Sequence, residues 1–145
     1  MANTGDILLR NQANFDDVMG TSVWLMGVGV ALRQPVKVDP ANDSTVIPCL
    51  ADGLPEEPCI GIISTLNSPS PGYCLVRTLG FVDGFAGLTR GKQYLLGRSV
   101  GTLVAADDTV NPDYPQIGTS FKQTLGVARS ATSLFVNVDP TTFDI

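Results

Sequence analysis

The sequence contains no histidine. An imidazole is the general base of a Ser–His–Asp triad and the commonest side-chain metal ligand, so its absence removes both roles. Cysteine is scarce as well: Cys49, Cys59 and Cys74 are the only three, and they form no C-x-x-C pair. This pattern favours neither a secreted disulfide framework nor a zinc site. We interpret the three thiols as small buried hydrophobic groups in a protein kept in a reducing compartment.

Charged side chains are also few. They make up 16% of the residues, whereas a typical globular domain has about 25%. The net charge is −5, and the nine lysines and arginines are scattered along the chain without forming a basic block. Because phosphate contacts supply most of the affinity for nucleic acid, we expect no DNA or RNA partner.

Long hydrophobic runs are missing too. The segment SVWLMGVGVAL at 22–32 is well short of the ~20 residues that a membrane-spanning helix needs. The first residues, MANTGDILLR, lack the basic start and apolar core of a signal peptide. We therefore expect no membrane partner, and synthesis in a cytoplasm.

What the sequence does have is glycine, proline and short apolar runs. The 145 residues include 15 glycines and 10 prolines, and 43% of the residues are hydrophobic. Apolar runs of a few residues between such breakers are typical of strands. We predict an all-β fold for residues 22–145, as one compact β-sandwich or small β-barrel of short antiparallel strands.

The strand boundaries follow from the turn residues. The clearest prediction is a hairpin of CIGIISTL (59–66) and YCLVRTLGFV (73–82) across the Pro/Gly turn at 67–72. The other expected strands are a buried strand in 22–38 turning at Pro35, a short strand in 44–50 broken by Pro48, and two further pairs, 93–97 with 101–105 and 124–130 with 133–138.

Residues 1–21 are polar and irregular but contain two short apolar groups. They are either a frayed terminus or an extended arm that becomes ordered against a neighbouring subunit. In the second interpretation the residues that anchor the contact are Ile7, Leu8, Leu9 and Phe15.

One motif suggests an enzyme. Gly97-Arg-Ser99-Val-Gly101 matches the G-x-S-x-G nucleophile elbow, which needs a strand before the serine and a helix after it. The following residues, VGTLVAADD, are a poor helix start, and no histidine is present to activate Ser99. Lys92 could serve as a base only if it were desolvated, and its neighbours are polar. We predict that Ser99 is a turn residue and that the protein is not an enzyme.

The remaining chemical candidates are weak. Three adjacent carboxylate pairs, at 16–17, 56–57 and 107–108, lie in sequences typical of solvated loops, so we expect no bound metal and no cofactor. The segment GFVDGFAGL at 80–88 sets Phe81 and Phe85 in a glycine-rich context. We expect a loop there that either contacts a partner or closes one end of a barrel.

The stretch GFVDGFAGLTRGKQYLLGRSVGTLV, followed by TLGVARSATSLFVNV, resembles a pattern found in virion proteins of tailed bacteriophages. Both capsid decoration (cement) proteins and β-rich tail-fibre modules share it. The match covers about 80–138, and its positions here are Gly91, Tyr94, Leu96, Gly101, Leu103, Gly126, Ala128, Ser130, Leu134 and Val136. Leu125 stands where valine is usual.

The resemblance implies a β fold that adheres to an assembled particle and carries no catalytic residue. Because the chain has neither a coiled coil nor a repetitive shaft, we expect a decoration protein, which implies a homotrimer on the capsid surface clamping adjacent major capsid protein subunits. The alternative is a tail-fibre or baseplate-associated β module for adhesion or receptor binding.

Overall fold

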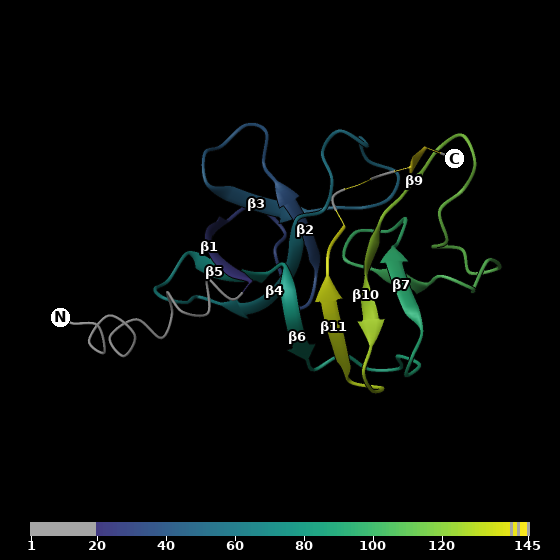
Figure 1. The fold of residues 1–145 in the computed structure, drawn as a ribbon. Coiled ribbons are helices and arrows are strands. Elements are labelled where there is room, and N and C mark those ends of the chain that lie inside the picture. Colours follow the sequence, from purple (N-terminus) through teal and green to yellow (C-terminus); the bar gives the residue numbers. More distant parts are fainter. Residues whose placement is uncertain (1–19, 140, 142, 145) are drawn as a thin grey trace.

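The computed structural model describes residues 20–139, 141, 143 and 144. The described chain is all β, and its strands form two main parts that lie side by side (Figure 1). The first part is a closed barrel in the order β1-β3-β2-β4-β5. Its strands are β1 (Thr21–Met26), β2 (Pro35–Val38), β3 (Thr45–Pro48), β4 (Gly61–Leu66) and β5 (Tyr73–Arg77).

The second part is a five-stranded antiparallel sheet in the order β6-β11-β10-β7-β8. Its strands are β6 (Leu79–Asp83), β7 (Gln93–Leu96), β8 (Leu103–Ala105), β10 (Thr124–Ala128) and β11 (Ser133–Asn137). The short strands β9 (Phe121–Lys122) and β12 (Phe143–Asp144) pair with each other beside this sheet.

The structure confirms the all-β class, the small barrel and the three predicted strand pairs. It corrects two boundaries. Pro35 does not turn a strand but begins β2, after an irregular connection from Met26. The first strand starts at Thr21, whose side chain is buried, one residue before the predicted start of this strand at residue 22. One pairing is also not antiparallel, because β1 and β3 close the barrel in parallel.

The second half of the predicted hairpin divides between the two parts. Residues 73–77 pair with β4 and β1 in the barrel, whereas residues 79–83 pair with β11 in the other sheet. Thr78 separates them, and the amides of Thr78 and Leu79 both donate to the carbonyl of Gly20, at 2.6 and 3.3 Å. Two residues facing one on the neighbouring strand form a β-bulge, which bends the strand. The bend carries one continuous segment from the barrel into the sheet.

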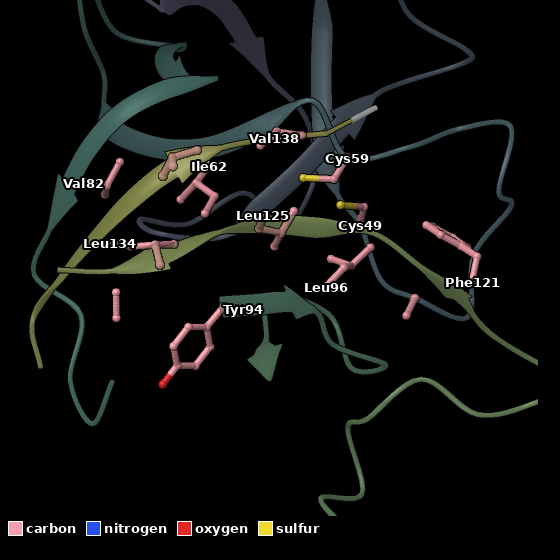
Figure 2. Packing of buried hydrophobic residues seen from close by; sticks show 13 residues of the cluster. Cys49, Cys59, Ile62, Val82, Tyr94, Leu96, Phe121, Leu125, Leu134 and Val138 are labelled. Carbon is pink, nitrogen blue, oxygen red and sulfur yellow. The ribbon is translucent and has the colours of Figure 1, made fainter. Parts of the chain in front are cut away.

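Each part has its own set of buried side chains. Alternating residues of the barrel strands fill the barrel interior, and these are Val36, Val46, Ile63, Cys74 and Val76. A second, larger cluster lies where the inner face of the sheet packs against the barrel side of the molecule (Figure 2). It joins Ile62 of β4 to Leu96, Leu125 and Leu134 of the sheet. Because this cluster draws on both parts, they pack as one unit.

A buried amide reinforces the contact between the two parts. Gln123, which is 1% exposed, accepts the amide of Cys59 at Oε1 over 2.8 Å. Its Nε2 donates to the carbonyl of Cys59 at 2.7 Å and to that of Asp139 at 2.9 Å. The side chain thus satisfies backbone groups of the segment that leads into β4 and of the segment that follows β11.

The three cysteines are free and buried, as the sequence predicts. Cys49 and Cys59 lie next to each other in the second cluster (Figure 2). The adjacent thiol of Cys59, together with burial, raises the pKa of Cys49, and burial raises the pKa of Cys74. Raised pKa values keep these groups as thiols, so they behave as hydrophobic side chains.

No helix long and apolar enough to cross a membrane occurs in the described part of the chain.

Candidate interaction surface

The outer face of the five-stranded sheet carries an exposed apolar strip. It consists of Leu79 and Phe81 of β6, Phe135 of β11 and Val127 of β10, and we call it the outer-face strip. Leu79 is 47% exposed, Phe81 44% and Val127 39%, while Phe135 is half-buried between its neighbours. The ladder places Phe135 directly opposite Phe81 on one side and Val127 on the other, so the strip crosses three adjacent strands.

The strip follows from the two-residue period of the strands. In β6 the side chain of Val82 points into the core, so Leu79 and Phe81 point to the outside. In β11 Leu134 and Val136 are fully buried, and Phe135 between them therefore lies on the outer face. A contiguous group of exposed apolar side chains, unlike a single one, is a mark of a binding surface.

Aromatic and charged contacts fix the shape of the strip. The rings of Phe81 and Phe135 are 5.2 Å apart at 59°, a tilted arrangement that aromatic pairs favour. The guanidinium of Arg129 lies 3.6 Å from the centre of the Phe81 ring and 3.6 Å from the carboxylate of Asp83. Arg129 thus covers one side of Phe81, and the strip has an ion pair at its rim.

The structure places Ser99 in the turn between β7 and β8, as the sequence predicts. Its hydroxyl donates to Oδ1 of Asp113 at 2.6 Å, and its carbonyl accepts from the hydroxyl of Thr102 at 2.6 Å. A strand and not a helix follows the turn. Lys92 forms an ion pair with Asp107 at 3.0 Å, and its side chain is 42% exposed. Ser99 therefore lacks both the helix and the desolvated base that a nucleophile elbow needs.

Next to this turn, a polar cluster ties loops together. Arg98 donates from Nε to Oδ1 of Asp52 at 3.2 Å and from Nη2 to Oδ2 at 3.0 Å, and Ser120 donates to the same carboxylate. These hydrogen bonds from Arg98 and Ser120 lower the pKa of Asp52. Arg98 also donates its amide to the carbonyl of Asp113. These hydrogen bonds join loops that are far apart in the sequence, so the cluster has a structural role in holding them together.

The other carboxylates that the sequence singles out lie in separate loops. Glu57 pairs with Lys37 at 2.8 Å, and Asp108 accepts from the side chain of Asn111 at 3.2 Å. No group of three or more potential metal ligands occurs among the residues that the structure describes. The pair at 16–17 lies outside them.

The expected site residues have two different outcomes. Ile7, Leu8, Leu9 and Phe15 lie outside the described residues, so their contact role stays a prediction. The expected loop around Phe81 and Phe85 is corrected in part: Phe81 belongs to strand β6, whereas Phe85 lies in the loop after β6 and packs, partly buried, against the second core cluster.

Three members of the strip, Leu79, Phe135 and Val127, were not expected from the sequence. The signal was present in SLFVNV, where Leu134, Phe135 and Val136 put apolar groups on both faces of one strand. Such a run is also typical of a strand buried on both faces. Only the exposure of these side chains in the folded structure shows that one face is open.

Comparison with known proteins finds no matching family model, no matching curated protein and no matching solved structure.

Proposed function

We propose that this protein is a non-enzymatic structural protein of a bacteriophage virion. In this proposal it is made in the host cytoplasm, binds the outside of the assembled capsid as a homotrimer and clamps adjacent major capsid protein subunits. The observation that carries the proposal is the outer-face strip, an exposed aromatic surface on a sheet whose other face is fully packed. A protein that acts by adhesion needs such a surface.

The resemblance to virion proteins covers the same region of the chain as the outer-face strip. Its span, about 80–138, coincides with the strands from β6 to β11, which form the sheet that carries the strip. Matching positions have structural roles: Leu96, Leu134 and Val136 are fully buried. Gly91 and Gly101 have φ values of 86° and 76° in turns, where glycine is favoured. The shared pattern is thus the framework that holds the strip, and not a set of reacting groups.

Capsid stabilisation then follows from mass action. A protein that binds the assembled shell and not the separated subunits shifts the equilibrium toward assembly. A trimer that touches several subunits gains further avidity, because the second and third contacts form at high effective concentration. Each contact can therefore be weak, in keeping with a strip of four side chains.

The first test is the copy number of this chain in purified virus particles, measured by quantitative mass spectrometry against the major capsid protein. A copy number comparable with that of the shell protein is expected. A handful of copies per particle would instead support the tail-fibre or baseplate module. Absence from particles would overturn the virion proposal.

The second test compares two variants in cosedimentation with capsids that lack the protein. Phe81→Ser removes the centre of the strip, whereas Ile117→Ser removes an equally apolar side chain that is 87% exposed in a loop elsewhere. We expect Phe81→Ser to weaken binding by about tenfold or more and Ile117→Ser to leave it unchanged. Equal binding of both variants would exclude the strip as the docking surface.

A further inference from the structure

Two of the three buried thiols lie side by side in the second core cluster. Cys49 and Cys59 are each 1% exposed, and Figure 2 shows their sulfur atoms next to each other. The thiol of Cys59 is the largest cause of the raised pKa of Cys49, as expected for two thiols within hydrogen-bonding reach. Cys74 lies apart from them, because its side chain belongs to the interior of the barrel. The fold therefore places Cys49 and Cys59 as a pair.

The main chain is fixed at both members of this pair. Cys49 directly follows β3, and its amide donates to the carbonyl of Pro35 in β2 at 3.1 Å. Cys59 lies two residues before β4, and the amide of its neighbour Ile60 donates to the next carbonyl of β2 at 2.8 Å. The amide and the carbonyl of Cys59 both bind the side chain of Gln123. Folding itself therefore brings the two thiols together, on either side of β2.

The nine residues between the cysteines form a loop that is held at its surface. None of the residues 52–58 is buried, and Leu54 is 51% exposed. Two ion pairs attach this loop, one from Asp52 to Arg98 at 3.0 Å and one from Glu57 to Lys37 at 2.8 Å. A segment without buried side chains opens at a low cost in free energy. Such an opening gives a small molecule access to the cysteines at the two ends of the loop.

We propose that Cys49 and Cys59 are the site of an intramolecular disulfide bond, which forms when the protein leaves a reducing compartment. In reducing conditions both remain thiols, as they are in the structure. The oxidant is a small-molecule disulfide. The thiolate of one cysteine attacks it and displaces one thiol, and the other cysteine then attacks the mixed disulfide and displaces the second thiol. The two cysteines thus lose two protons and two electrons, and the small disulfide is reduced to two thiols.

The bond would strengthen the part of the fold where the barrel meets the sheet. It joins the end of β3 to the start of β4, next to the hydrogen bonds of Gln123. A disulfide stabilises mainly by restricting the unfolded chain, and for a loop of this length we expect the melting temperature to rise by roughly 5–10 °C.

The inference goes beyond the virion proposal and does not depend on it. In a virion protein the bond would form after the particle leaves the host cytoplasm, and so after assembly. Absence of the chain from virus particles would overturn the virion proposal and leave the disulfide unaffected.

The test is to refold the full chain from urea in a mixture of reduced and oxidised glutathione, and to incubate the folded protein in the same mixture. Refolding gives the oxidant access to every cysteine, so its result does not depend on the opening of the loop. Remaining thiols are alkylated in denaturant and counted by mass spectrometry. We expect one alkylated cysteine per wild-type chain, and peptide mapping should place it at Cys74.

Two alanine variants complete the test. Cys74→Ala is the matched control, because it removes a buried thiol outside the pair, and it should leave no cysteine to alkylate. Cys49→Ala should keep both remaining cysteines as thiols. Oxidation should raise the melting temperature of the wild type and of Cys74→Ala by roughly 5–10 °C, and should leave that of Cys49→Ala unchanged.

The wild type alone is sufficient to refute the proposal. Three alkylated cysteines after refolding in the glutathione mixture would overturn it. A bond that includes Cys74, or one between two chains, would overturn it as well, since either would show that the fold does not favour the pairing of Cys49 with Cys59.

Discussion

Gln123→Met should destabilise the protein strongly although it changes the side-chain volume little. Gln123 is 1% exposed and makes three hydrogen bonds, two to the backbone of Cys59 and one to that of Asp139. Methionine has a similar length and no strong hydrogen-bonding group. The packing of the second core cluster is therefore kept, while the backbone groups of Cys59 lose their partners.

The expected magnitude follows from these two groups. Each buried backbone group left without a partner costs about 1–3 kcal/mol, so the amide and carbonyl of Cys59 together cost about 3–4 kcal/mol. The lost hydrogen bond to the carbonyl of Asp139 adds little to this cost in free energy, because Asp139 is exposed and water can replace the lost donor. For a chain of this size the loss corresponds to a fall in melting temperature of roughly 10 °C.

Urea denaturation followed by tryptophan fluorescence measures the change, since Trp24 is the only tryptophan and packs against the barrel core. Gln116→Met is the control, because Gln116 is exposed and should change the free energy of unfolding by no more than about 0.5 kcal/mol. A loss below about 1 kcal/mol in Gln123→Met would show that the two parts are not held together through this amide.

Three other variants test the packing and the polar cluster. Leu134→Ala, on the fully buried side of β11, should lower the free energy of unfolding by about 2–5 kcal/mol in the same denaturation assay. Gly126→Ala should cost about 1–3 kcal/mol, because its methyl group would collide with the carbonyl oxygen of Phe135, and a stable variant would contradict this close approach. Asp52 has a folded-state pKa below 3.8, owing to Arg98 and Ser120, so its contribution is present above pH 3.8 and is lost as the pH falls through the lower value. The stability difference between wild type and Asp52→Asn should therefore be largest near neutral pH and vanish in acid, and a difference independent of pH would refute this role.

The polar cluster and the outer-face strip have different roles: the cluster makes contacts within the fold, and the strip is exposed to solvent. Ser99, in the turn between β7 and β8, and the carboxylate of Asp52 form hydrogen bonds with other parts of the same fold. The strip, by contrast, exposes Phe81 and Leu79 without any covering element in the described chain. In the proposed function, the strip supplies the adhesive surface, and the hydrogen bonds of the polar cluster hold the loops of the sheet that presents it.

Several features could be read from the sequence because they depend on neighbouring residues. Glycine and proline between short apolar runs determined the all-β class, and the turn at 67–72 determined the hairpin of β4 and β5. The buried cysteines and the turn position of Ser99 were predictable for the same reason. In each case the evidence lies within a few residues of the feature.

Other features depended on contacts between segments far apart in the chain. The run YCLVRTLGFV predicted one strand, but the bulge opposite Gly20 divides it between the barrel and the sheet. Likewise, Gln123 shows nothing in its own surroundings that marks it as the partner of Cys59. A local pattern cannot indicate such a partner.

The candidate surface shows the same division. The two-residue period determined which side chains of β6 and β11 share a face, and so placed Phe81 with Leu79 and apart from Val82. Which strands are neighbours, and which face stays open, depended on the tertiary structure alone. The physical reason is that strand pairing is set by backbone hydrogen bonds, which are the same for every residue, and by the burial of one face against a distant part of the chain.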